Sequence, residues 1–166
     1  MRRKGTALAL AGLGFLGLGG APSAAAGTGD EIRRTADVLL QANAHSHEEV
    51  HAALRGLVGN AGDLGRQAGL PGPAQAKLDA AGAEARRLSP LDHTVRAKLA
   101  EAYAALDGGR SFAFPKEVGS IEQARAYGRG QVDRSLAALD AGRPQEAARE
   151  LVGLVLLVIT PMEKSR

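Results

Sequence analysis

The chain of 166 residues contains no cysteine and no tryptophan, and only 3% of its residues are aromatic. The lack of cysteine excludes disulfide bonds, a thiol nucleophile and a lipid-modified cysteine anchor. The scarcity of aromatic rings leaves little surface on which nucleic-acid bases could stack. A single domain of this length must therefore be stabilised by its hydrophobic core alone, which is feasible at this size.

The chain also has no net positive charge outside its N-terminal residues. The chain has 21 basic and 18 acidic residues, a net charge of +3. Arg2, Arg3 and Lys4 account for this excess, so residues 27–166 carry no net charge. Because attraction to phosphates dominates nucleic-acid binding, we expect no nucleic-acid partner.

The N-terminal segment has the three parts of a secretory signal peptide. Basic residues 2–4 precede an apolar stretch over residues 6–18, and small residues follow as far as Ala26. The pattern Ala24-x-Ala26 fits the cleavage site of such signals. The apolar stretch is shorter than the roughly 20 residues that span a bilayer. We therefore predict a cleaved signal peptide over residues 1–26, with no transmembrane anchor after cleavage.

The signal predicts a periplasmic or secreted bacterial protein whose mature domain covers residues 27–166. The general secretory route is favoured, and the Arg2-Arg3 pair leaves the twin-arginine route open.

The mature chain is rich in helix signals. Apolar residues recur at spacings of three and four, as in amphipathic helices, and glycine and proline clusters separate the segments. The predicted helices cover residues 28–58 (with up to two further turns to residue 68), 74–88, 90–106, 120–139 and 145–159. These patterns predict an all-α fold: an antiparallel bundle of four to five helices with one long loop, residues 110–119.

Capping boxes are predicted at the starts of two helices, one from Thr28 to Glu31 and one from Ser120 to Gln123. Residues 151–159 are apolar at nearly every position, which is typical of a helix at the centre of a fold. A buried strand is the alternative for that segment.

The helix predicted over residues 120–139 should pack closely against a neighbour. Ala124 and Gly128 leave room for a close approach, and the inward side chains are expected to be Val132, Leu136 and Leu139. Its arginines are expected to form a salt-bridged, solvated face with Glu122 and Asp133. These arginines are Arg125, Arg129 and Arg134.

The loop predicted over residues 110–119 contains two of the few aromatic side chains. Phe112 and Phe114 alternate there, and we expect them to hold the loop against the helices. A docking strip for a partner is the alternative.

Three of the four histidines lie close together, at His45, His47 and His51. His47-Glu48-x-x-His51 matches the pattern in which two imidazoles one helical turn apart bind zinc and the glutamate acts as general base. Glu49 is charged where such a helix usually carries an apolar residue, and no third-ligand motif follows. The candidate metal ligands are therefore His47 and His51, and His45 can join only if the helix is distorted. Ordinary surface or core histidines are the alternative.

No phosphate-binding glycine loop, nucleophilic serine elbow or isolated carboxylate pair is present in the sequence. We therefore predict an exported, non-enzymatic helical protein that binds a protein or small-molecule partner. The alternative is a metal-binding protein that uses the histidine cluster to hold a divalent transition metal such as zinc. A zinc-dependent hydrolase is the extreme form of that alternative.

Overall fold

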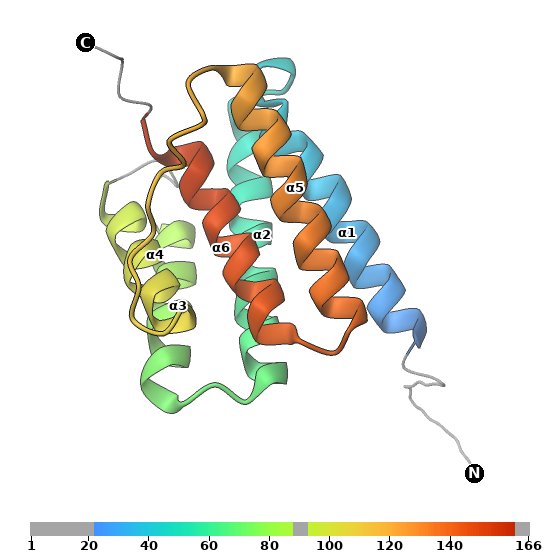
Figure 1. Ribbon diagram of the computed structural model, residues 1–166, viewed down its shortest axis with the longest axis vertical. Coiled ribbons are helices and arrows are strands. Elements are labelled where there is room, and N and C mark those ends of the chain that lie inside the picture. Colours follow the sequence, from blue (N-terminus) through green and yellow to red (C-terminus); the bar gives the residue numbers. More distant parts are fainter. Residues whose placement is uncertain (1–21, 88–92, 162–166) are drawn as a thin grey trace. The chain divides into compact units, whose positions relative to one another are not determined.

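The computed structural model describes residues 22–87 and 93–161. Within them the chain forms six α-helices and one short 3₁₀ helix, and no β-strand (Figure 1). The elements are α1 (Pro22–Leu40), η1 (Ala42–Ala44), α2 (His47–Ala68), α3 (Gly72–Arg87), α4 (His93–Leu106), α5 (Ile121–Asp140) and α6 (Pro144–Ile159). The predicted all-α class is confirmed, and the alternative of a strand over residues 151–159 is wrong.

The chain divides into two compact units, residues 1–34 and residues 35–166. Of the first unit, the described part is the N-terminal portion of α1. The basic and apolar parts of the predicted signal peptide lie outside the described residues. No helix in the described ranges is both long enough and apolar enough to cross a membrane.

In the second unit, α6 packs against α2, α4 and α5, and Figure 1 shows it between α4 and α5 with α2 behind. Residues 151–157 are all buried, and Leu154 is completely shielded from solvent. Burying one leucine contributes about 1.5–3 kcal/mol, so this run is a main source of stability. The prediction that residues 151–159 form a helix is confirmed, because α6 spans them.

The helix predicted over residues 28–58 is in fact two helices, because α2 has its own start at Ser46. The Ser46 Oγ accepts a hydrogen bond from the Glu49 N–H at 3.2 Å, and the Glu49 carboxylate accepts one from the Ser46 N–H at 2.9 Å. This capping box satisfies backbone donors locally and so competes with a continuous helix. Gly59 does not end α2, which continues to Ala68 and stops at Gly69 with a φ of 67°.

The predicted capping box at Thr28 does not start α1. The helix begins upstream, at Pro22, and Thr28 lies inside it. The intervening residues include three consecutive alanines, Ala24 to Ala26, and alanine has the highest intrinsic helix propensity. Because helix formation propagates through such residues, the start moves toward the N-terminus.

At the start of α5, only half of the predicted capping box forms. The Ser120 Oγ accepts a hydrogen bond from the Gln123 N–H at 3.1 Å. The Gln123 side-chain oxygen accepts from the Gly119 N–H at 2.7 Å instead of from Ser120. Both bonds still satisfy backbone donors at the helix start.

The face of α5 that meets α6 differs from the predicted one. Val132 is buried as expected, whereas Leu136 and Leu139 are only half-buried. The residues buried around Val132 are Gly128, Gln131, Ser135 and Ala138. Apart from Gln131, these neighbours are small, which lets the helices lie close together and leaves the two leucines at the flanks.

Two observations show how closely α5 approaches its neighbours. A Cβ atom at Gly128 would lie 2.5 Å from the Leu40 Cδ2 and 3.1 Å from the Leu154 Cδ1. The buried Ser135 hydroxyl donates a hydrogen bond to the Ala147 carbonyl of α6 at 3.0 Å. The close approach predicted at Gly128 is therefore confirmed.

Candidate functional site: a histidine pair and an apolar groove

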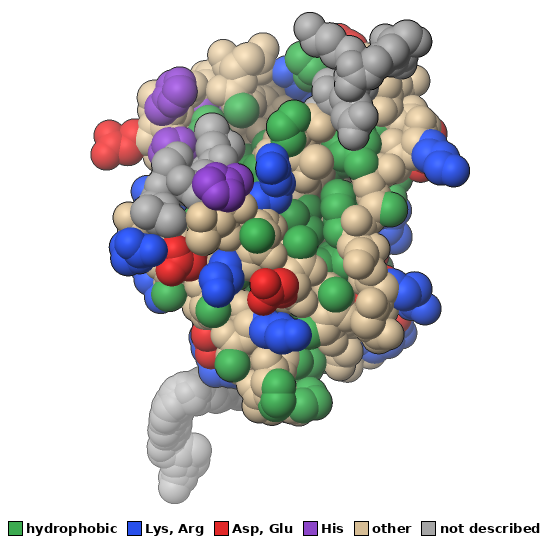
Figure 2. Space-filling model, turned by 90° about the vertical axis from the view of Figure 1, so that its left-hand side faces the viewer, with side chains coloured by type: hydrophobic (Ala, Val, Ile, Leu, Met, Phe, Trp, Pro, Cys, Tyr) green, Lys and Arg blue, Asp and Glu red, His purple; other side chains and the backbone are tan. Residues whose placement is uncertain are grey.

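The two histidines predicted to bind metal lie next to each other at the start of α2. His47 is the first residue of the helix and His51 lies one turn further on. Their ring centres are 6.0 Å apart, with the ring planes at 72°. In Figure 2, histidine side chains gather in the upper left part of the visible face. This juxtaposition follows directly from the spacing of four on a helix.

His45 lies outside α2, before its N-cap residue. Its Nδ1 is 3.5 Å from the Glu49 Oε1, which also takes part in the capping box. The hydrogen bonds from Ser46, above all the one from its backbone N–H, lower the pKa of Glu49. In the described residues, no group of three or more histidine, cysteine, aspartate or glutamate side chains is placed to hold a metal ion.

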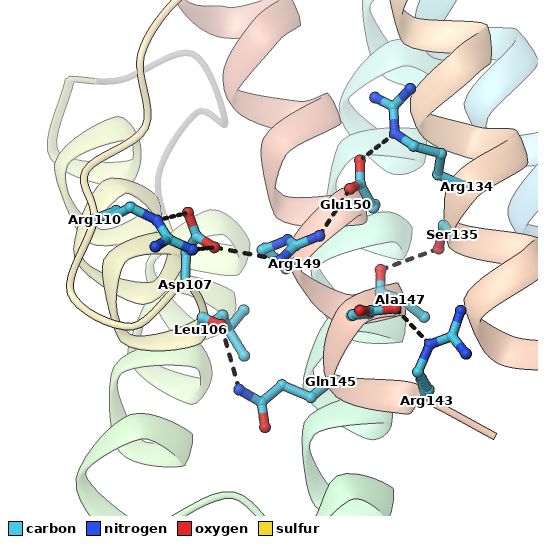
Figure 3. Close-up of polar contacts among 11 residues, drawn as sticks. Leu106, Asp107, Arg110, Arg134, Ser135, Arg143, Gln145, Ala147, Arg149 and Glu150 are labelled. Carbon is cyan, nitrogen blue, oxygen red and sulfur yellow. Dashed lines mark hydrogen bonds and ion pairs between the residues drawn. The ribbon is translucent and has the colours of Figure 1, made fainter. Parts of the chain in front are cut away.

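A network of ion pairs connects α4 with α6 (Figure 3). Asp107 directly follows α4 and receives bonds from Arg110 at 3.1 Å and from Arg149 at 3.3 Å. Arg149 also contacts Glu150 at 3.2 Å, and Arg134 of α5 reaches the same carboxylate at 3.3 Å. The hydrogen bond from Arg110 is the main cause that lowers the pKa of Asp107. Each of the three arginines contacts at least one of the two carboxylates, so the network is structural.

A cavity of about 370 Å³ lies beside this network. The arginines that line it are already paired with carboxylates of the protein. Arg143 bonds Glu146 at 2.7 Å, and Arg149 contacts Asp107 and Glu150. A ligand anion would therefore compete with carboxylates of the protein itself.

The prediction that aromatic side chains hold the loop against the helices is confirmed for Phe112. Phe112 packs edge to face against Tyr103 of α4, with ring centres 5.5 Å apart, and so attaches the loop to that helix. Phe114 is half-buried. Burial is the main cause that raises the pKa of Tyr103, and the nearby charge of Asp107 adds to it.

An apolar groove of about 410 Å³ is lined by three segments of the chain. They are the end of α1 with η1, the start of α5, and the end of α6 with the residues that follow it. Its walls are mainly aliphatic, with Leu40, Ile121, Ala124, Leu157 and Val158 among the lining residues. Ile121 is 58% exposed and is the one large hydrophobic residue of the described chain that is exposed. Water therefore contacts apolar surface that a bound molecule would cover.

Among the described residues, Arg125 is the only charged one that lines this groove. Its Nε donates a hydrogen bond to the Leu40 carbonyl at 2.9 Å, and its Nη2 donates one to the Asn43 Oδ1 at 2.8 Å. Leu40 is the last residue of α1, so its carbonyl accepts no hydrogen bond from within the helix. The helix dipole also makes a cation favourable at that end.

These contacts correct the predicted salt-bridged face of α5 for two of its arginines, Arg125 and Arg134. Arg125 bonds two neutral oxygens rather than the carboxylate of Glu122 on its own helix. Arg134 pairs with Glu150 of α6 and lies over the Tyr127 ring, 5.7 Å from its centre.

The sequence did not point to the groove, because its walls come from three distant segments. These are residues 39–43, 121–125 and 157–161. The one local signal is the spacing of four between Ile121 and Arg125, which places an aliphatic and a cationic side chain on the same helix face.

Comparison of the chain with protein-family models, with curated proteins and with solved structures found no match. A proposal about its function therefore rests on the chemistry of the groove and of the histidine pair.

Proposed function

We propose that this chain is an exported, non-enzymatic protein whose residues 27–166 form an antiparallel helical bundle that binds a small apolar molecule in the groove. The signal-like N-terminal sequence supports export to the periplasm or the medium. The observation that carries the binding proposal is the groove itself, with its aliphatic walls and its volume of about 410 Å³. Pockets for small ligands have volumes of about 300–1,000 Å³ and predominantly apolar walls.

The polar residues of the groove favour binding over catalysis. They are Arg125, Asn43 and Thr160. Arginine stays protonated at any physiological pH, and asparagine and threonine do not titrate, so none of the three can act as a general acid or base near neutrality. Their chemistry suits the orientation of a ligand.

The binding proposal is tested with Nile red, an uncharged dye whose fluorescence increases in apolar surroundings. We expect the full chain to bind the dye and Ala124→Phe to reduce binding severalfold, because the new ring would fill the groove. Ala126→Phe is the matched control, since Ala126 is exposed on the same helix and does not line the groove. The comparison between the two variants removes any contribution from the apolar segment at residues 6–18. Equal dye binding by both variants would contradict the proposal.

The histidine pair supports a second candidate function, the binding of a divalent transition metal. Zinc–nitrogen bonds of about 2.0–2.1 Å would bring the two ring centres only slightly closer than the observed 6.0 Å. His47 and Glu48 are exposed at the helix start. Electrostatic stabilisation of a transition state is stronger in a site shielded from bulk water, so we favour simple metal binding over the zinc hydrolase.

Addition of zinc, copper or nickel at pH 7 is expected to raise the melting temperature of the protein by a few degrees if His47 and His51 bind the metal. His47→Ala or His51→Ala should abolish the shift. His45→Ala should preserve it, because His45 lies outside α2. The metal proposal fails if no metal shifts the wild type, or if His45→Ala has the same effect as the other two variants.

A further inference from the structure

We propose that the ligand of the groove is an amphipathic monocarboxylate, an apolar chain with one carboxylate that Arg125 binds. This inference rests on the proposed function and specifies the chemical class of the ligand. The apolar chain would lie along the aliphatic walls, and the carboxylate would lie beside the guanidinium.

The first argument is the unbalanced charge of Arg125. Many arginines of the described part contact a carboxylate within 4.0 Å, among them Arg66, Arg87, Arg110, Arg134, Arg143 and Arg149. Arg125, by contrast, is half-buried and has hydrogen bonds only to two neutral oxygens among the described residues. Arg55 is also half-buried and bonds a neutral oxygen, the Ala85 carbonyl, but only Arg125 of these two lines the apolar groove. A charge removed from water in apolar surroundings is destabilising unless it is paired. A ligand carboxylate would supply the missing negative charge.

The second argument is the fixed geometry of the guanidinium. Arginine has five N–H donors, and the bonds to Leu40 and Asn43 use one at Nε and one at Nη2. The remaining donors, two at Nη1 and one at Nη2, form no hydrogen bond to the described residues. They lie in one plane and match the two oxygens of a carboxylate. Because the side chain is already held in place, less conformational entropy is lost on binding.

Asn43 adds a second donor beside Arg125. A guanidinium can only donate hydrogen bonds, so the Asn43 atom that it meets must be the side-chain oxygen. The Asn43 amide nitrogen therefore remains a donor to an anionic oxygen. Asn43 is exposed, which places this polar end of the groove near water, as the head of an amphiphile requires.

The charge count favours a single carboxylate over a dianionic head group. Arg125 provides one positive charge, and no other charged side chain lines the groove as it is described. A second negative charge on the ligand would therefore be left without a partner next to aliphatic walls.

The test compares dodecanoate with dodecanol, which has the same chain and no carboxylate, by displacement of Nile red below their aggregation concentrations. We expect dodecanoate to bind at least tenfold more tightly, since hydrogen bonds to charged groups stabilise by roughly 1.5–3 kcal/mol, or about tenfold to a hundredfold. Arg125→Gln should bring the ratio of the two affinities close to one. The matched control is Arg129→Gln, which removes the same charge from an exposed position of α5 and should preserve the ratio.

Arg125→Gln also removes the hydrogen bond to the Leu40 carbonyl and could therefore disturb the fold. A second variant tests the proposal without this change. Asn43→Asp leaves Arg125 in place and puts a carboxylate beside it, which should strengthen their contact and occupy the guanidinium. We expect this variant to weaken dodecanoate binding by tenfold or more and to change dodecanol binding much less.

The outcomes separate the two proposals. Equal affinity of the wild type for dodecanoate and dodecanol, or an unchanged ratio in Arg125→Gln or Asn43→Asp, overturns the carboxylate and leaves the apolar groove in place. If neither compound displaces the dye, and Ala124→Phe binds the dye as the wild type does, the proposed function itself is wrong.

Discussion

Leu154→Asp is expected to unfold the protein or to lower its free energy of unfolding by about 4 kcal/mol or more. The substitution would remove a side chain that is fully buried in α6 and place a carboxylate among aliphatic neighbours. Large-to-small changes of a buried leucine cost about 2–5 kcal/mol, and an unpaired buried charge adds to that cost. Because whole domains are stable by only about 5–15 kcal/mol, most of the stability would be lost.

Urea denaturation followed by circular dichroism measures this effect. Ile121→Asp is the matched control, because it places the same carboxylate at an exposed aliphatic residue in the first turn of α5. It should change the free energy of unfolding by less than about 0.5 kcal/mol. If Leu154→Asp stays monomeric and as stable as the wild type, the apolar run of α6 faces solvent or a partner instead of the core.

Replacement of Ala24 or Ala26 by leucine is expected to block removal of the proposed signal peptide, whereas Ala25→Leu should be processed normally. Signal peptides are cleaved after small residues at alternate positions, and the middle position of Ala24-x-Ala26 is not constrained in this way. N-terminal sequencing of the exported wild type should begin at Gly27. In the two blocked variants, the signal should stay attached, and the chain should be larger by the mass of residues 1–26.

Recovery of the wild type with Met1 intact on a membrane-bound species would contradict the proposed cleavage.

Cleavage after Ala26 would also change the start of α1. The first residues of α1 precede Gly27, so processing would remove the present helix start at Pro22. Thr28 and Glu31, which lie inside α1 in the full chain, would then be positioned to cap a shortened helix.

Local pattern predicted the helices well where a single apolar stripe faces one neighbour. In α4, the stripe of Val95, Leu99, Ala102 and Leu106 is buried throughout. The predicted stop after it is also confirmed, with α4 ending at Leu106. The first residues of the predicted range, 90–92, lie outside the described residues.

Periodicity failed where two local signals competed. A spacing of three and four runs through residues 40–57, which favours a single helix, but Ser46 and Glu49 form a capping box in the middle of it. The spacing of apolar residues says nothing about those two hydrogen bonds, so a prediction based on it alone did not find the break between α1 and α2. The break also moved His45 out of the helix, whereas His47 and His51 kept the relation that their spacing implies.

The sequence by itself determined the all-α class, the central place of the apolar helix and the adjacency of His47 and His51, because spacing along a helix decides which side chains share a face. The tertiary structure alone decided which face of α5 is buried, because the distance between helix backbones selects Gly128, Ser135 and Ala138 over larger leucines. It alone also brought Arg125 to the end of α1 and left it with two neutral partners. Contacts between segments more than eighty residues apart depend on how the helices pack, and local sequence pattern carries no record of that packing.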